Sequence, residues 1–174
     1  MSKYISFLSA TAITQAVVIG NIFAFGVLFP LMVKEVGSTL MEAAAAGSLQ
    51  FGALFIGALV AVPMAERFGP RLPALVGALL WFGGMYGLST SSNPYDPVLY
   101  IGLMCGIGGS LAYWSPISQL SRWSGKKVQP MGWVLACAAL GQIAFVFAIP
   151  PRVSSAQWKT TIQTTAYTGF AFLL

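Results

Sequence analysis

The sequence is poor in charge and contains no histidine. Only 7% of its 174 residues are charged, with nine Lys plus Arg and four Asp plus Glu, while 57% are apolar. Soluble domains carry roughly 25% charged residues, so this composition excludes an ordinary soluble domain. The absence of histidine removes the commonest metal ligand and the commonest proton carrier of proteins.

Cysteine is scarce as well. Cys105 and Cys137 both fall within apolar stretches, where they are expected to be small packing residues without disulfide or metal-ligand spacing. No cofactor is therefore expected. Ser110, Ser115 and Ser118 supply hydroxyl groups, but no basic side chain stands near them in type or spacing. The sequence thus does not predict an enzyme.

Long apolar stretches are the main feature that is present. An apolar helix of about 20 residues crosses the ~30 Å hydrocarbon core of a membrane, and a helix satisfies its own backbone hydrogen bonds there. The sequence predicts an all-α membrane protein, a bundle of six transmembrane helices. The six spans are expected near 4–33, 43–65, 72–91, 97–121, 131–151 and 160–174.

The sixth span is shorter than the others. Residues 160–174 would form a helix of about 22 Å, which is less than the ~30 Å core. The final residues, Gly169 to Leu174, are all apolar and include no basic anchor. We therefore expect this helix to be truncated and the chain to be a fragment of a longer protein.

The basic residues favour one orientation in the membrane. If the N-terminus is cytoplasmic, six Lys and Arg lie on the cytoplasmic side and three lie on the other side. Basic residues close to the spans resist translocation, so this orientation is expected. The positive charge then reflects topology, and no nucleic-acid partner is expected. The sequence does not identify the membrane; the plasma membrane is one candidate.

Small residues recur at a spacing of three or four within the spans. Such spacing places them on one face of a helix, where they let two membrane helices approach closely. The simpler interpretation is that these residues only pack the bundle. The alternative is that they form thin contacts between helices that move against each other. The sets are Ala53 and Gly57, Gly83 and Gly87, Gly102, Gly106 and Gly109, and Cys137 and Gly141.

A short charged stretch, Glu66-Arg67-Phe68-Gly69-Pro70-Arg71, separates the second and third spans. It is expected to form a tight loop, because Gly69 permits a sharp turn and Pro70 stiffens it. Glu66 is expected to pair with Arg67 or Arg71.

Three motifs give the chain a family resemblance. They are the stretch 23–29 followed by Lys34-Glu35, the charged stretch 66–71, and Arg122-Trp123-Ser124-Gly125-Lys126-Lys127 followed by Met131-Gly132. On these residues the chain resembles the N-terminal half of a major facilitator superfamily transporter, and it is most similar to the monocarboxylate-carrier-like branch. The stretch 66–71 is similar to the family's Asp-Arg-x-Gly-x-Arg loop.

The resemblance implies two six-helix halves around a central cavity, each built from inverted three-helix repeats. It implies a secondary transporter that moves a small organic solute by alternating access, with the lipid bilayer and a missing C-terminal six-helix half as partners. Glu66, Arg67, Gly69 and Arg71 would form a cytoplasmic gating loop. Arg122, Lys126 and Lys127 would form the branch's basic loop.

In this family spans one, two, four and five line the cavity, which directs attention to polar or aromatic residues near the middle of those spans. Each could contact solute or could form a hydrogen bond between helices. Pro116 is expected to kink the fourth span beside Tyr113. The cavity candidates are Thr14, Asn21, Phe25, Gln50, Tyr113 and Gln142.

The sequence departs from the family pattern in places. Val62 stands where the motif often has glycine, and Val27 stands where some monocarboxylate carriers have a lysine. No ionisable residue lies deep within a predicted span, so a monocarboxylate is only a possible substrate. The alternatives are a six-span membrane protein that acts as a partner or regulatory subunit without transport, and a truncated inactive product.

Overall fold

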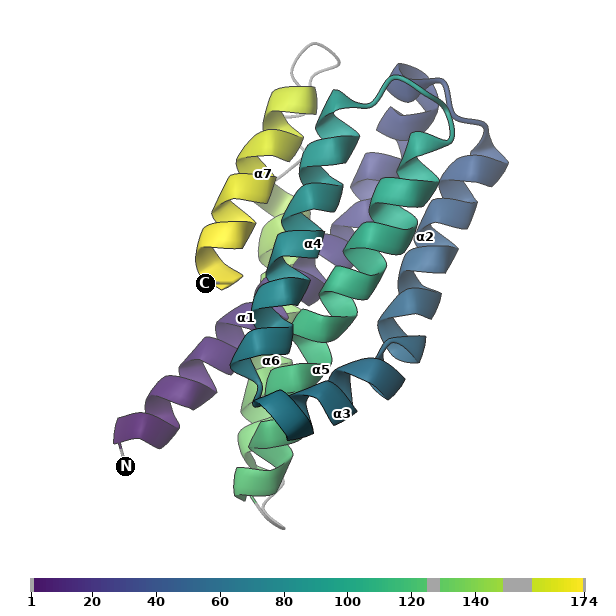
Figure 1. The fold of residues 1–174 in the computed structure, drawn as a ribbon. Helices are drawn as coiled ribbons and strands as arrows, with labels where there is room; N and C mark the ends of the chain where they lie inside the picture. Colours follow the sequence, from purple (N-terminus) through teal and green to yellow (C-terminus); the bar gives the residue numbers. More distant parts are fainter. Residues whose placement is uncertain (1, 125–128, 149–157, 174) are drawn as a thin grey trace.

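The chain folds as a bundle of helices (Figure 1). The structure is a computed structural model that describes residues 2–124, 129–148 and 158–173, and every regular element in those residues is helical. The elements are α1 (Ser2–Leu31), η1 (Met32–Val36), α2 (Leu40–Ile56), α3 (Ala58–Phe68), α4 (Arg71–Thr90), η2 (Val98–Cys105), α5 (Gly106–Ser124), α6 (Gln129–Ala148) and α7 (Trp158–Leu173); η1 and η2 are π-helical.

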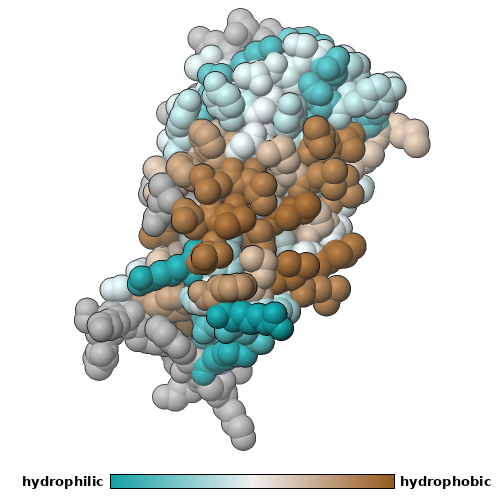
Figure 2. All heavy atoms as spheres, in the orientation of Figure 1, coloured by the Kyte–Doolittle hydropathy of each residue, from teal (hydrophilic) through white to brown (hydrophobic). Residues whose placement is uncertain are grey.

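Several of the described helices have the apolar length that crossing a membrane requires. Three stretches are long and apolar enough to cross it, Ile5–Pro30, Arg71–Thr90 and Val98–Arg122, and α2 with α3 forms a fourth if the bent pair counts as one span. Pro130–Ala144 is a shorter apolar helix. Figure 2 shows an apolar band across the middle of the molecule, with hydrophilic side chains toward both ends. The prediction of an all-α membrane protein is thus confirmed.

The second span begins earlier than the sequence analysis predicted, at Leu40. Thr39 and Glu42 form a reciprocal capping box: the Glu42 carboxylate accepts from the Thr39 backbone N–H at 2.8 Å, and the Glu42 N–H donates to the Thr39 hydroxyl at 3.2 Å. This pairing satisfies backbone donors that a helix start otherwise leaves open. The charged Glu42 therefore lies inside the first turn of the helix, and it does not precede the helix.

The same span is broken, which the sequence analysis did not predict. At Gly57 the chain bends by 41° between α2 and α3. Pro63, inside α3, removes one backbone donor and crowds the preceding turn. Figure 1 shows α3 turning away from α2 and crossing the lower end of the bundle, where it packs on α5. Pro116 lies inside α5, which is continuous from Gly106 to Ser124, and the kink expected there stays a prediction.

The helices approach each other closely where small residues face one another. A Cβ placed on Gly141 of α6 would lie 2.5 Å from the carbonyl oxygen of Ala16 in α1, and one on Gly106 would lie 2.7 Å from the Cβ of Ala53. Because lipid gives no hydrophobic drive for helices to associate, this close packing is a main source of their cohesion. The seams predicted at Gly57, Gly106 and Gly141 are therefore contacts between helices.

Trp81 of α4 lies at the centre of the described bundle and is 1% exposed. Its indole N–H donates to the Asn21 side-chain oxygen in α1 at 3.3 Å. The Trp81 carbonyl accepts a hydrogen bond from the Cys105 thiol, at the end of η2, at 3.6 Å. The Trp81 ring lies against Gly169 of α7. The side chain and the carbonyl group of this one residue in the third span thus contact the first, fourth and sixth spans.

The packing at Gly77 gives a stability prediction. A Cβ there would lie 2.6 Å from the Gly108 carbonyl oxygen and 2.7 Å from the Ala112 nitrogen. Because backbone atoms cannot rotate away, Gly77→Ala should force α4 and α5 apart and cost of order 1–3 kcal/mol. The matched variant Gly52→Ala meets nothing within 4 Å and should be neutral or slightly stabilising. Thermal unfolding of the two purified variants in detergent measures the difference; equal melting temperatures would contradict this packing.

Candidate functional site: the α3–α5 seam and the polar residues of the bundle

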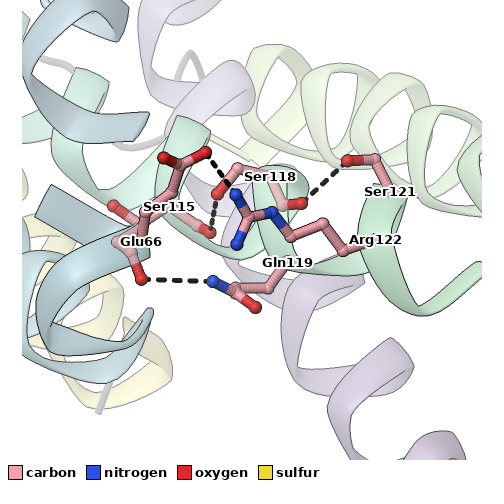
Figure 3. A network of polar contacts seen from close by, with 7 residues as sticks. Glu66, Ser115, Ser118, Gln119, Ser121 and Arg122 are labelled. Carbon is pink, nitrogen blue, oxygen red and sulfur yellow. Dashed lines mark hydrogen bonds and ion pairs between the residues drawn. The ribbon is translucent and has the colours of Figure 1, made fainter. Parts of the chain in front are cut away.

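Two hydrogen-bonded contacts join α3 to the C-terminal part of α5 (Figure 3). The Arg122 guanidinium forms an ion pair with the Glu66 carboxylate, and the closest nitrogen and oxygen are 2.5 Å apart. One turn earlier, the Gln119 side-chain amide donates to the Ala65 carbonyl at 3.1 Å. The ion-paired side chains are 54% and 43% exposed. We call these four residues the α3–α5 seam.

The seam corrects two expectations about the charged stretch 66–71. Glu66 pairs with Arg122 of the fourth span, 56 residues away, rather than with Arg67 or Arg71. The stretch is also mostly helical, because Glu66, Arg67 and Phe68 end α3 and Arg71 begins α4. Gly69 does make the expected turn: its φ of 79° lies in the left-handed region that side chains disfavour.

Arg67 and Arg71 are exposed. Neither has an ion-pair or hydrogen-bond partner among the described residues. Of the predicted basic loop, Arg122 lies in α5, whereas Lys126 and Lys127 lie outside the described residues.

A tryptophan of the fourth span contacts the second span beside its bend. The Trp114 indole N–H donates to the Leu54 carbonyl at 2.8 Å, just before the bend at Gly57. Ser110 lies directly against Gly57 and leaves no room for a side chain there. Side chains of α5 therefore hold the span at the bend and again near its C-terminal end.

Among the cavity candidates, Asn21 has a structural role in this conformation. It is 3% exposed. Its amide nitrogen donates to the Met85 sulfur at 3.6 Å, and its oxygen accepts from Trp81. Both partners lie in α4, the third span, which the family resemblance places outside the cavity. For this residue the structure supports the helix-to-helix interpretation.

Thr14 and Gln142 are each half-buried. The Thr14 hydroxyl donates to the Ala10 carbonyl of its own helix at 2.9 Å, so its hydrogen-bonding need is met locally. Gln142 lies on α6 beside the glycine that contacts Ala16.

The other three candidates lie where α1, α2 and the fourth span meet. The Phe25 ring fills the space over Gly47 of α2. Gln50, one turn further along, is 1% exposed, and its side-chain oxygen has no hydrogen-bond partner in the described chain. Tyr113 packs against a cluster that includes Val18 of α1 and Leu54 of α2, and its ring lies 4.9 Å from that of Trp114.

Sequence reasoning missed Gln15, which bridges the first and fourth spans. It is fully buried, and its amide nitrogen donates to the Tyr113 carbonyl at 2.9 Å. Its side-chain oxygen has no partner within the described ranges. A buried amide in an apolar span is the signal that could have identified it, as it did for Gln50.

The electrostatics of the described spans are simple. Every charged residue in them lies near a helix end or in a turn. No group of His, Cys, Asp and Glu that could hold a metal ion is found in the described ranges. The spans can thus offer neutral hydrogen-bonding groups and aromatic rings to a solute, while charge is confined to the two ends.

These features define a helical membrane protein whose spans pack through small residues and whose charges lie at the membrane faces. Residues 11–174 match the Major Facilitator Superfamily. The chain therefore belongs to this family, and the resemblance that its motifs indicate is confirmed.

Curated relatives share modest identity with the chain. "MFS-type transporter pynF" of Aspergillus niger is 23% identical over 158 residues, covering 89% of this chain and 36% of the relative. "Monocarboxylate transporter 7" of Homo sapiens is 28% identical over 134 residues, covering 77% of this chain and 25% of the relative. "Monocarboxylate transporter 10" of Homo sapiens is 29% identical over 140 residues, covering 75% of this chain and 27% of the relative. The chain thus spans about a quarter to a third of the length of these three relatives.

The bond between Asn21 and Trp81 gives a second prediction. Asn21→Leu keeps the approximate volume but leaves the Trp81 N–H without its acceptor, so stability should fall by about 0.6–1.7 kcal/mol, the usual range for bonds between membrane helices. Thr14→Val, on the same helix, removes only a local bond and should change stability by less. Thermal unfolding in detergent compares the two. An unchanged melting temperature for Asn21→Leu would contradict the structural role and return Asn21 to the cavity candidates.

Proposed function

We propose that the chain is the N-terminal six-helix half of a secondary transporter that moves a small organic solute by alternating access. Membership of the Major Facilitator Superfamily is the observation that carries this proposal. The match to monocarboxylate transporters over three quarters of the chain supports it further. The second, C-terminal half of the transporter is the partner that this proposal requires.

The α3–α5 seam supports a specific gating role. A charge pair that forms in one conformation and separates in another shifts a two-state equilibrium by the difference in its energy. Glu66 and Arg122 are partly exposed, so their pair contributes at most about 1 kcal/mol, which suits a contact that must open during a cycle. In this proposal α3 moves relative to α5 about the bend at Gly57.

The substrate is a small organic solute, and a monocarboxylate is the class that the names of the relatives suggest. Gln50, Phe25, Tyr113 and Gln142 remain the proposed solute contacts of this half. Because the described spans place no cation at mid-membrane, a carboxylate would need its positive partner from the other half. The proposed orientation keeps the N-terminus and the 66–71 stretch on the cytoplasmic side, following the distribution of Lys and Arg.

The proposal is tested first by the size of the natural product and then by uptake. An antibody against residues 122–130 should detect a product at least twice the 18.4 kDa of this chain. That product, reconstituted in liposomes, should take up ¹⁴C-lactate or, if the solute is neutral, an uncharged polyol such as ¹⁴C-erythritol. A product of about 18 kDa that catalyses neither uptake would instead support a six-span partner protein without transport.

The Glu66–Arg122 pair gives a prediction for transport. Glu66→Arg alone and Arg122→Glu alone each place like charges across the seam and should slow uptake severalfold, about fivefold for a loss of 1 kcal/mol. The double variant restores an opposite-charge pair and should recover most of the rate. Lys34→Glu, at the opposite membrane face, is the matched charge-reversal control. If the double variant is as slow as the singles at equal protein abundance, the pair does not control gating.

A further inference from the structure

The corner where α3 meets α4 carries an exposed surface that no part of the described bundle covers. It consists of Arg67, Phe68, Arg71 and Leu72, and we call it the corner patch. Both arginines are exposed, and Phe68 and Leu72 are 63% and 49% exposed. Figure 2 shows hydrophilic side chains at this lower end of the molecule, next to the apolar band.

The patch has an uncompensated positive charge. Glu66 is the only acidic residue described at this end of the bundle, and it is paired with Arg122. The guanidinium groups of Arg67 and Arg71 therefore have no carboxylate partner among the described residues. Guanidinium groups bind phosphate through two parallel N–H bonds, so the chemistry of the patch suits a phosphate group.

The length of the broken span places this patch at headgroup depth. The 17 residues of α2 and the 11 of α3 together form about 40 Å of helix, which exceeds the ~30 Å hydrocarbon core. Even with the 41° bend, the end of α3 extends into the headgroup layer. The neighbouring outer side chains, Leu59 at 77% and Val60 at 57% exposure, are apolar and suited to the acyl region beside it.

We propose that the corner patch binds an anionic phospholipid of the leaflet that it faces. Arg67 and Arg71 contact the headgroup phosphate, while Phe68 and Leu72 contact the upper acyl chains. The proposal depends on membrane insertion of the bundle and not on transport.

The test measures lipid retention directly. The natural product and its variants are reconstituted in nanodiscs of phosphatidylcholine and phosphatidylglycerol, extracted in mild detergent, and analysed by native mass spectrometry. Two arginines near an anionic surface contribute about 1 kcal/mol each, so Arg67→Gln with Arg71→Gln should lower phosphatidylglycerol retention roughly 30-fold at low salt. Phosphatidylcholine carries the same phosphate but no net negative charge, so its retention should change much less, which also reports an intact fold.

The matched control removes the same charge elsewhere. Lys34→Gln with Lys159→Gln takes two exposed lysines from the opposite end of the bundle and should alter retention less than twofold. High salt should weaken wild-type retention, since exposed charges are screened. Equal retention by the arginine variant, or an equal loss in the lysine control, would overturn the proposal. Displacement of the lipid by millimolar inorganic phosphate would also overturn it, because the patch would then be a site for a small soluble anion.

This result and a transport result can be told apart. If the arginine variant loses the lipid while the full-length protein shows no uptake, the lipid site stands and the transporter proposal fails. If uptake is found but the variant retains phosphatidylglycerol fully, the lipid site fails and the transporter proposal stands. An acidic segment of the C-terminal half on these arginines would give the second result, and that outcome rejects the lipid.

Discussion

The close approach of helices around Trp81 is the contact on which the rest of the bundle depends. In a membrane, burying apolar surface between helices gains little, because lipid tails are as apolar as the side chains. Cohesion must therefore come from backbone proximity and buried hydrogen bonds. Trp81 combines both: its indole bonds to Asn21, its carbonyl accepts from Cys105, and its ring lies on Gly169. The first, third, fourth and sixth spans are thereby fixed to one another, and the second span is left to be positioned by the fourth.

This division is consistent with a bend that lies in the second span. The second and fourth spans run in the same direction, because their contacts advance together along both. Gly106 lies against Ala53, and further along both spans Arg122 pairs with Glu66. Each fourth-span side chain compensates a specific weakness of its neighbour. Trp114 donates to the Leu54 carbonyl before the bend, Ser110 fits the space over Gly57, and Gln119 donates to a carbonyl near the helix end. A break in a membrane helix is tolerated when such partners are available.

The helix positions could be predicted from the sequence, because apolar runs and flanking charges determine where a helix can cross lipid. The close contacts of Gly106 and Gly141 were likewise visible as small-residue spacing. The bend at Gly57 could not be predicted, because the apolar run continues through it and Pro63 lies six residues beyond it. The partners of Glu66 and Asn21 could not be derived, since they lie 56 and 60 residues away. Such pairings depend on how each helix is rotated about its axis, which an almost uniformly apolar span leaves undetermined.

The parallel course of the second and fourth spans has an electrostatic consequence. Both α3 and α5 end at the same membrane face, so the negative ends of two helix dipoles lie side by side there. Arg67 stands in the last turn of α3 and Arg122 in the last turn of α5, where a cation offsets the partial negative charge of the terminal carbonyls. The same basic residues that set the orientation of a membrane chain thus also reduce a repulsion that its own topology creates. Reversing their charge would disturb the ends of two helices even if insertion were unaffected.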